Sequence, residues 1–339
     1  MKQTGVVILN WNGKKLLEQF LPVLLRCTPT EKADVIVADN ASSDDSLAFL
    51  SEHYPGVKTI VLDKNYGFAE GYNRAFSGLE YEYVVLLNSD VEVTPDWLSL
   101  AVDYLDEHPE ISALQPKLLD YKDKSKFEYA GACGGYMDYL GYPFCRGRVF
   151  DTLETDKGQY DNPQEILWGS GACLFMRLKD YEEAGGLDAE FFAHQEEIDL
   201  CWRLNARGKK IVSFPQSVVY HVGGATLAME HPRKTYLNFR NNLLLLYKNL
   251  PEKYYKKVMS YRFFLDYLAA LRFLLKGGGK NAYSIWKARR DFRRMKTDYK
   301  EIRKQNLLLS VVELPPGIMK KSLLWQYYIG KKRKFSKLK

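Results

Sequence analysis

The chain has 339 residues, of which 46% are hydrophobic and 27% charged, a composition that excludes a disordered chain and leaves room for one large α/β domain with an appendage, or for two domains. The net charge of +7 hides a division: residues 1–232 hold 21 Lys and Arg against 36 Asp and Glu (−15), and residues 233–339 hold 28 against 6 (+22). An acidic body therefore precedes a strongly basic region, and we expect the two to meet different partners.

The first apolar run, at residues 5–9, is too short for the core of a signal peptide and is typical of a first strand. Five cysteines are an odd number, and their spacing matches no metal-binding pattern. We therefore expect free thiols, a reducing compartment and a cytoplasmic protein.

Up to about residue 113, short β-branched runs alternate with helical patterns, which predicts βαβ units and a parallel, right-handed sheet. The last helix of this part is predicted to begin at Thr94 and Pro95, as N-cap and first-turn proline. The predicted strands are 5–9, 34–38, 58–62 and 83–87, and the predicted helices are 14–27, 46–53, 69–79 and 95–108.

The rest of the chain is less regular. Residues 114–162 show no sustained period and predict irregular loops with short strands over the carboxyl edge of the sheet. A strand is expected around 168–176, a helix at 196–206, and extended segments at 210–214 and 217–221. From about Pro232 the sequence predicts a mainly helical, basic region.

Polar residues follow three predicted strands where each one ends. Asp90 closes Asn88-Ser89-Asp90 after the apolar run Val84–Leu87, a position that suits a metal-bound phosphate, although a turn with a capping Asp is the alternative. Asp39 ends the second strand, where a carboxylate can accept hydrogen bonds from a base or a ribose, and one of the residues 42–44 is expected to cap the next helix.

The third cluster, Asn65-Tyr66-Gly67-Phe68, opens a helix, where glycine permits close backbone approach and free N–H groups attract phosphate. The three clusters are expected to converge on one crevice. The first strand ends in Asn10-Trp11-Asn12-Gly13, so the G-x-G-x-x-G fingerprint is absent, which argues against an NAD or FAD dehydrogenase.

Two further candidates lie downstream. Glu196 and Glu197 raise each other's pKa, as a general base requires, whereas Asp199 and Arg203, at i and i+4, are predicted to form a structural pair. His221 follows an apolar strand and precedes Gly223-Gly224, which leaves a metal or phosphate role open beside that of an ordinary polar residue.

Taken together, these motifs resemble the family-2 inverting glycosyltransferases with the GT-A fold, most closely a bacterial rhamnosyltransferase-like branch. The resemblance covers about residues 3–245 and rests on the order of seven motifs. They are Val7-Ile8-Leu9-Asn10-Trp11-Asn12-Gly13, Val37-Ala38-Asp39-Asn40-Ala41-Ser42-Ser43-Asp44, Asn65-Tyr66-Gly67-Phe68, Asn88-Ser89-Asp90, Trp168-Gly169-Ser170-Gly171, Glu196-Glu197-Ile198-Asp199-Leu200-Cys201-Trp202-Arg203 and His221-Val222-Gly223-Gly224.

The resemblance implies a GT-A, Rossmann-like, mostly parallel sheet in residues 1–232 and a basic helical extension in 233–339. Residues 1–113 would bind the nucleotide sugar and 114–232 the acceptor. It implies a metal-dependent, inverting transfer of rhamnose or a hexose from a dTDP- or UDP-linked donor. The acceptor would be a hydroxyl of a lipid-linked saccharide used in cell-surface polysaccharide synthesis.

The resemblance also assigns roles to residues. Asp39 would bind the base or ribose, and Asn10, Asn65, Gly67 and Asn88 would help to hold the nucleotide. Asp90 and His221 would hold Mg²⁺ or Mn²⁺. Glu197, where the family usually has Asp, would be the general base with Glu196 as the alternative, and Trp168, Gly169 and Ser170 would form the floor of the sugar and acceptor pocket.

The basic region contains an apolar run, residues 259–275, that is too short and too charged to span a bilayer. Arg262, Asp266, Arg272 and Lys276 fall on one arc of a helical wheel, which predicts an amphipathic helix suited to an anionic membrane surface at the inner face of the cell membrane. Packing on the catalytic domain or on a second copy is the alternative, and no recognition fold accompanies the charge, which argues against nucleic acid.

Two rival functions remain. Sugar-nucleotide pyrophosphorylases need a glycine-rich basic loop after the first strand, and Asn10-Trp11-Asn12-Gly13 is not one. A catalytically degenerate nucleotide-sugar-binding subunit of a polysaccharide synthase complex gains support from Asn88 and Glu197, the two departures from the family pattern.

Overall fold

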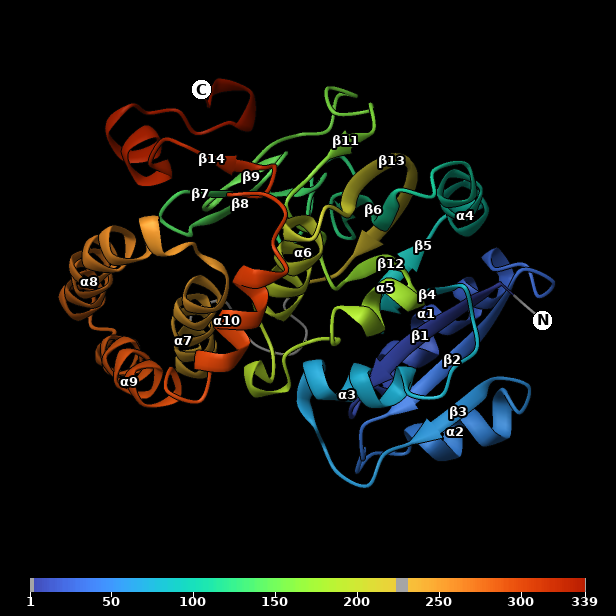
Figure 1. Ribbon diagram of the computed structural model, residues 1–339. Coiled ribbons are helices and arrows are strands. Elements are labelled where there is room, and N and C mark those ends of the chain that lie inside the picture. The colour runs from blue at the N-terminus through green and yellow to red at the C-terminus, as the bar shows by residue number, and fades with distance from the viewer. Residues whose placement is uncertain (1–2, 224–230, 339) are drawn as a thin grey trace.

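The computed structural model describes residues 3–223 and 231–338, which fold around a large sheet and a smaller one (Figure 1). The large sheet has the strand order β11-β13-β6-β12-β4-β1-β2-β3, and β5 pairs with β13 outside this path. Its strands are β1 (Thr4–Asn10), β2 (Ala33–Asp39), β3 (Lys58–Val61), β4 (Tyr83–Leu87), β5 (Val91–Val93), β6 (Ile111–Asp120), β11 (Gln164–Glu165), β12 (Cys173–Arg177) and β13 (Lys210–His221).

The first four strands confirm the parallel sheet predicted from the sequence. Strand β1 pairs in parallel with β2 and with β4, and β2 with β3. The next strand in the order, β12, runs antiparallel to both β4 and β6, whereas β13 pairs in parallel with β6. The sheet is therefore mixed at its centre and mostly parallel elsewhere.

Helices cover both faces of this sheet because its central strands are buried on both sides. On β1, Val6 and Ile8 pack toward α1 (Lys14–Cys27), α2 (Ser46–His53) and α4 (Trp97–Glu107). Val7 points to the other face, where the core includes side chains of helices from four parts of the chain. Those helices are α3 (Gly67–Phe76), α5 (Leu178–Glu183), α6 (Glu196–Ala206) and α7 (Pro232–Asn249).

Several predicted boundaries were wrong: the helix predicted at 69–79 is α3 (Gly67–Phe76), and the strand predicted around 168–176 is β12 (Cys173–Arg177). Two other differences have a clear physical reason. Residues 111–120 form β6, a strand at the centre of the sheet, where an irregular segment was expected from residue 114. The strand shows no alternation because nine of its ten residues are buried, and Lys117 is buried with Asp156 and Asp161 as partners. Helix α4 begins at Trp97, two residues later than predicted, because Thr94 donates its hydroxyl to the carbonyl of Val218 and Asp96 has a φ of 60°.

The remainder of the middle segment builds the smaller sheet, of order β10-β9-β8-β7-β14. Its last strand comes from the C-terminal part of the chain and pairs in parallel with β7. The C-terminal part of the chain therefore packs on the acidic body of the protein (Figure 1). The strands are β7 (Gly135–Asp138), β8 (Pro143–Cys145), β9 (Arg148–Val149), β10 (Thr152–Leu153) and β14 (Ile318–Met319).

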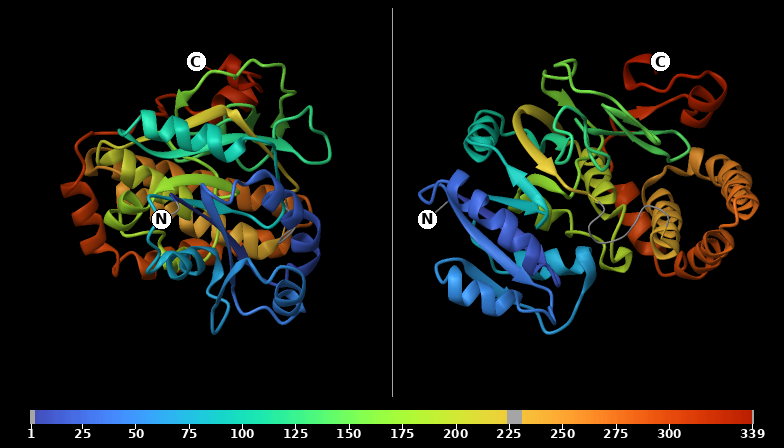
Figure 2. Two further views of the ribbon diagram at one scale, coloured as in Figure 1. Left: turned by 90° about the vertical axis from the view of Figure 1, so that its right-hand side faces the viewer. Right: turned by 180° about the vertical axis from the view of Figure 1, so that it is seen from behind.

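The basic region is mainly helical, as predicted, with α8 (Glu252–Leu275), α9 (Gly279–Met295) and α10 (Lys300–Leu308) after α7. Figures 1 and 2 show α7, α8 and α9 at the end of the molecule opposite α2 and β3. A buried ion cluster ties this region to the body: Lys248 Nζ of α7 lies 2.8 Å from Asp199 Oδ2 of α6 and 2.5 Å from Asp188 Oδ2. The division of the chain at residue 232 into two functional units stays a prediction.

The charged arc predicted on α8 does not point to solvent, as it would on an amphipathic helix at the surface. Arg262 and Asp266 are buried against the protein, and Arg289 of α9 reaches Asp266. The apolar side of α8 faces outward instead. Within residues 3–223 and 231–338, no helix combines the length and the apolar character that a bilayer span needs. All five cysteines are free thiols, as predicted.

The buried ion cluster predicts a test of how the basic region is held. Lys248→Met should lower the free energy of unfolding by about 3–5 kcal/mol, because it leaves Asp188 without its cation and removes one of the two cations that pair with the buried Asp199. Chemical denaturation of the full chain measures this. The matched control is Lys253→Met, whose cation is 68% exposed and pairs with Glu313; its loss should stay within about 1 kcal/mol. Equal losses in both variants would contradict the role of the cluster.

Candidate active site at the carboxyl edge of the sheet

The ends of β1 and β2 bring Asn10 and Asp39 together, because the two residues are direct partners in the parallel register. Asp39 is fully buried and accepts from Asn10 Nδ2 at 3.0 Å and from the backbone N–H of Ser42 at 2.8 Å. Asp44 accepts from the N–H of Ser46, the first residue of α2, but the N-cap residue of this helix is Asp45 and not one of residues 42–44 as expected. Asp39 is thus held in one orientation at the edge.

Asn40 joins the second and third polar clusters, and the sequence reasoning did not single it out. Its Nδ2 donates to the carbonyl of Gly67 at 3.0 Å, and its Oδ1 accepts from the N–H of Tyr66 at 2.9 Å. The N–H groups of Phe68 and Ala69 donate to the carbonyl of Phe192. The expectation of free N–H groups for phosphate at this helix start was therefore wrong.

Gly67 permits a close approach of the chain, as expected, and the segment that approaches it is the loop before α6. The φ of Gly67 is +77°, and a Cβ there would lie 2.5 Å from the ring of Phe192. The missing side chain lets the loop before α6 approach the start of α3. Gly67 and Asn65, whose Oδ1 accepts from the N–H of Gly67, therefore connect the nucleotide side of the edge to the segment that carries Glu196 and Glu197.

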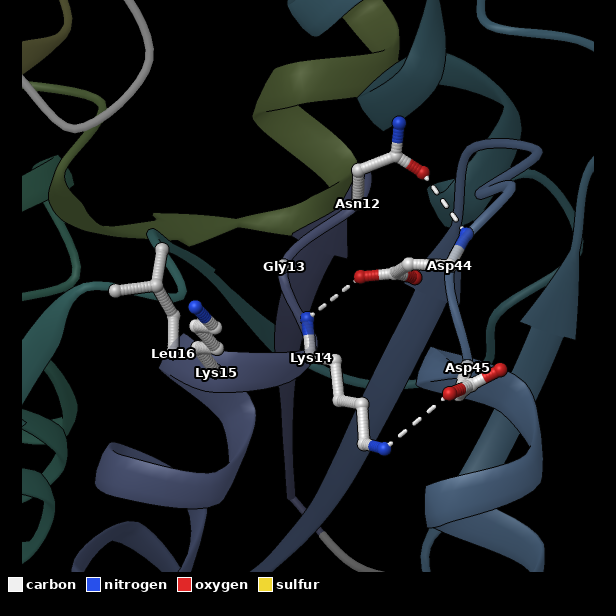
Figure 3. Close-up of a pocket in the computed structure, with 7 residues that line it drawn as sticks. All are labelled: Asn12, Gly13, Lys14, Lys15, Leu16, Asp44 and Asp45. Atoms are coloured by element: carbon white, nitrogen blue, oxygen red, sulfur yellow. Dashed lines mark hydrogen bonds and ion pairs between the residues drawn. The ribbon is translucent and has the colours of Figure 1, made fainter.

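A surface hollow lies beside this edge, after the end of β1 (Figure 3). The backbone N–H of Lys14 donates to Asp44, and Asn12 Oδ1 accepts from the N–H groups of Ser43 and Asp44. Lys14 and Asp45 form an ion pair at 3.5 Å across it. The N–H of Asn12 donates to Ser42 Oγ, which links the hollow to the Asp39 cluster.

His221 lies at the centre of the second part of the site, at the end of β13. Its Nε2 is 3.1 Å from Asp90 Oδ1 and 3.4 Å from Asn88 Nδ2. Asp90 and His221 are both buried, and the N–H of Val222 donates to the carbonyl of Asp90. The structure therefore brings together the two residues expected to hold a metal, although they are 131 positions apart. Gly224 of the same motif lies outside the described residues.

Glu128 is a third acidic residue at this point, and the sequence reasoning missed it. Its Oε1 is 3.2 Å from Nδ1 of His221, an ion-pair distance at which the N–H is not aligned as in a hydrogen bond. Burial alone would lower the pKa of His221, but Glu128 and Asp90 outweigh burial and raise it to about 10. The two carboxylates therefore favour positive charge at this position.

The chemistry of Asp90, His221 and Glu128 fits a site for a divalent cation. Hard cations such as Mg²⁺ are commonly held by one or two carboxylates together with substrate phosphates and water. Asp90 offers a carboxylate and His221 an imidazole, while Glu128 lies on the far ring nitrogen, as the outer partner of a metal-bound histidine does. No group of three or more His, Cys, Asp or Glu in residues 3–223 and 231–338 forms a closed metal site. A cation here would thus depend on oxygen atoms from a ligand.

Glu196 and Glu197 form the first turn of α6. Glu196 is buried and Glu197 half-buried, and Oε2 of each has no hydrogen-bond partner among the described residues. Burial raises the pKa of Glu197 to about 7, and burial together with the charge of Glu197 raises the pKa of Glu196 well above its usual range. Such carboxylates exchange a proton near neutral pH, as a general base must. Asp199 and Arg203 pair at 2.9 Å, as predicted.

Trp168, Gly169 and Ser170 lie beneath the smaller sheet. The indole N–H of Trp168 donates to the carbonyl of Tyr136 at 3.0 Å, and the N–H of Ser170 donates to Gln115 Oε1 at 2.8 Å. Both side chains are buried. The structure shows packing contacts for these residues, and their role as the floor of an acceptor pocket stays a prediction.

Two cations near the acids were also missed. Arg148 is buried, rests on the ring of Tyr129, and its Nε has no hydrogen-bond partner among the described residues. Burial lowers the pKa of Lys234 of α7, and the nearby charge of Glu128 opposes this effect. Lys234 also helps to lower the pKa of His194, next to the acid pair, to about 4, although burial is the main cause. Helix α7 thus contributes charge to the site.

The raised pKa of Glu197 predicts a pH-dependent stability. Because its folded-state pKa lies above the unfolded value, its contribution to stability is lost as pH rises through about 7. Glu197→Gln should therefore raise the melting temperature at pH 8 by at least about 2 °C, with a smaller gain at pH 5. The control is Glu52→Gln, at a side chain that is 77% exposed. Absence of a pH-dependent gain in Glu197→Gln, measured by thermal denaturation, would contradict the burial of this charge.

Comparison with known proteins shows which proteins this chain is similar to. Residues 5–144 match the sequence profile described as Glycosyl transferase family 2. The chain is 27% identical over 232 residues to the N-acetylglucosaminyl-diphospho-decaprenol L-rhamnosyltransferase of Mycobacterium tuberculosis, a match that covers 64% of this chain and 75% of the relative. It is 24% identical over 217 residues to the rhamnosyltransferase WbbL of Escherichia coli, covering 61% and 77%.

A solved structure agrees. The crystal structure of GalNAc-T7 with UDP, GalNAc and Mn²⁺ matches with a TM-score of 0.61 at 14% identity, over 98% of this chain and 57% of that one. At this identity the likeness shows the fold. The chain therefore has a GT-A fold, its residues 5–144 match a glycosyl transferase family 2 domain, and its relatives support glycosyltransferase activity.

Proposed function

We propose that this protein is a metal-dependent, inverting glycosyltransferase that moves rhamnose or a hexose from a dTDP- or UDP-linked donor to a hydroxyl of a lipid-linked saccharide, in cell-surface polysaccharide synthesis at the inner face of the cell membrane. One observation carries the proposal. A buried Asp90–His221–Glu128 cluster lies at the edge where Asp39 also ends its strand.

The chain's own residues divide the work. Asp39, with Asn10 and Asn65, binds the base or ribose, and Asn88 lies beside the diphosphate. Asp90 and His221 hold Mg²⁺ or Mn²⁺, which neutralises charge on the leaving diphosphate when bound. Glu197 takes the proton from the attacking acceptor hydroxyl, and its raised pKa suits this task.

The family and its relatives support the substrate classes in this proposal. The M. tuberculosis relative acts, by its name, on a decaprenol-linked N-acetylglucosaminyl diphosphate, and GalNAc-T7 was solved with UDP and Mn²⁺. Arg148 and Lys234 are cations close enough to Glu128 for its charge to oppose the lowering of their pKa by burial, and they would attract the phosphates of a donor or an acceptor. A buried cation without an anionic partner favours such a ligand.

A catalytically degenerate nucleotide-sugar-binding subunit is the second candidate. Asn88 and Glu197 favour it, because the resemblance expects Asp at both positions. Against it, burial keeps the pKa of Glu197 in the working range of a general base.

Two substitutions separate the candidates. Glu197→Gln should lower transfer at least about 10²-fold through loss of the general base, and should leave the metal-dependent melting shift with dTDP or UDP intact. Asp90→Asn should lower both transfer and that shift. Sugar transfer is measured with dTDP-rhamnose and UDP-hexoses on a lipid-linked saccharide. A melting shift with no transfer in the unaltered protein would favour the degenerate subunit. Absence of a shift with any nucleotide would contradict the proposed donor site.

Glu128 predicts a separate effect on metal binding. Glu128→Gln should weaken Mn²⁺ binding by about 10–100-fold, because the outer partner of a metal-bound histidine sets its orientation and basicity. Titration of Mn²⁺ in the presence of UDP or dTDP, followed by electron paramagnetic resonance, measures the dissociation constant. The control is Glu92→Gln, a carboxylate that pairs with Lys124. Unchanged Mn²⁺ affinity in Glu128→Gln would show that Glu128 does not act through His221.

A further inference from the structure

Helix α8 presents a long apolar surface to solvent. Phe264 is 71% exposed, Leu268 61% and Leu275 80%, although these are side chains that proteins normally bury. The positions 261, 264, 268, 271 and 275 follow helical spacing and form one stripe about 21 Å long. We call this stripe and its two flanking residues the outer face of α8: Tyr261, Phe263, Phe264, Leu268, Leu271, Leu274 and Leu275.

The opposite side of α8 explains why the apolar side points outward. Arg262 and Asp266 are buried, 3.1 Å apart, and Arg289 of α9 completes the cluster. Arg262 also donates to the carbonyl of Leu140 at 3.0 Å. Charges buried in this way must keep their partners, because breaking a buried pair is costly. The outer face of α8 therefore cannot turn inward without losing these bonds.

The charges around the outer face select its partner. Lys256 and Lys257 are exposed near one end, and Arg272, Lys276 and Lys280 near the other. After Glu252, the only carboxylate on α8 is the buried Asp266. A second copy would bring a region of charge +22 against its like, which disfavours a dimer through this face. Anionic lipid headgroups complement these cations, and acyl chains complement the apolar stripe.

We infer that the outer face of α8 lies in the plane of an anionic bilayer, with its apolar side chains between the lipids and the flanking cations at the headgroups. A second element extends this surface. Arg272 of α8 donates to the hydroxyl of Tyr328 at 3.2 Å, in the short helix Trp325–Ile329, where Trp325 and Ile329 are also exposed. An exposed Trp or Tyr is typical of side chains at a membrane interface.

The membrane face connects to the acid pair through one helix. Arg262 bonds to Asn242 Oδ1 of α7, and Asn242 Nδ2 donates to Gln195 Oε1 at 3.1 Å. Gln195 directly precedes Glu196 and Glu197. Hydrogen bonds therefore connect the segment that carries Glu197, the proposed general base, to α8, the helix that would contact the lipid. This arrangement suits an acceptor held in the membrane. This last step rests on the proposed function, whereas the membrane contact does not.

Vesicle flotation of the full chain tests the inference without any assay of transfer. The protein should float with vesicles of phosphatidylglycerol and phosphatidylcholine, and much less with phosphatidylcholine alone. The triple variant Phe264→Ser, Leu268→Ser, Leu271→Ser should lower partition at least about tenfold, because three apolar side chains no longer enter the bilayer. The matched control is Val61→Ser with Leu100→Ser, two exposed apolar residues of the catalytic body; it should float like the unaltered protein.

Two further measurements keep the outcomes distinct. Arg272→Gln with Lys276→Gln should weaken flotation, and added salt should reduce it further. Failure of the unaltered protein to float, or equal flotation of the triple variant and its control, would overturn the inference. A dimer in sedimentation velocity that the triple variant converts to monomer would assign the face to a second copy instead. The nucleotide-dependent melting shift, measured on the same variants, reports the donor site separately.

Discussion

The carboxylate of Asp199 is the point on which the arrangement of the acid pair depends. It is completely buried in α6, one turn after Glu196, and receives bonds from Arg203, Lys248 and Asn249. The last two belong to α7, so the same carboxylate holds α6, the helix that carries Glu196 and Glu197, to the basic region. The neighbouring cations lower its pKa despite the opposing effect of burial, whereas burial raises the pKa of Glu196 and of Glu197. Three acids within four residues thus have two opposite environments.

The same rule, that a buried charge keeps a partner, explains the outward apolar face of α8. Arg262, Asp266 and Arg289 satisfy one another between α8 and α9. Because this side of α8 is used for polar contacts, the aromatic and leucine side chains have no place left inside the protein. The exposed apolar surface is therefore a consequence of the internal packing, and the membrane contact that we propose would cover it.

The sequence predicted the parts of the site that follow from periodicity. Parallel strands end at one edge, so Asp39 and Asp90 were expected near each other from the strand pattern alone. Glu128 was not predicted, because it stands alone in a segment without a period, and only the fold brings it to His221. Which face of α8 points to solvent was not predicted either. A helical wheel places Arg262 and Asp266 on one arc, but it does not show whether that arc contacts water or another helix. Lys234 was counted only as part of a basic region.

The charge around His221 shows how the fold compensates for a change in a motif. The resemblance expects two aspartates where this chain has Asn88 and Asp90, so the local segment carries one negative charge fewer. Glu128 supplies a second carboxylate from a different part of the chain, 3.2 Å from the imidazole on its other side. Asn88 Nδ2, at 3.4 Å from Nε2, adds a neutral polar contact in place of the missing charge. The total charge that faces a cation at this position is therefore set by the packing of β13 against the middle segment, and not by the three-residue motif alone.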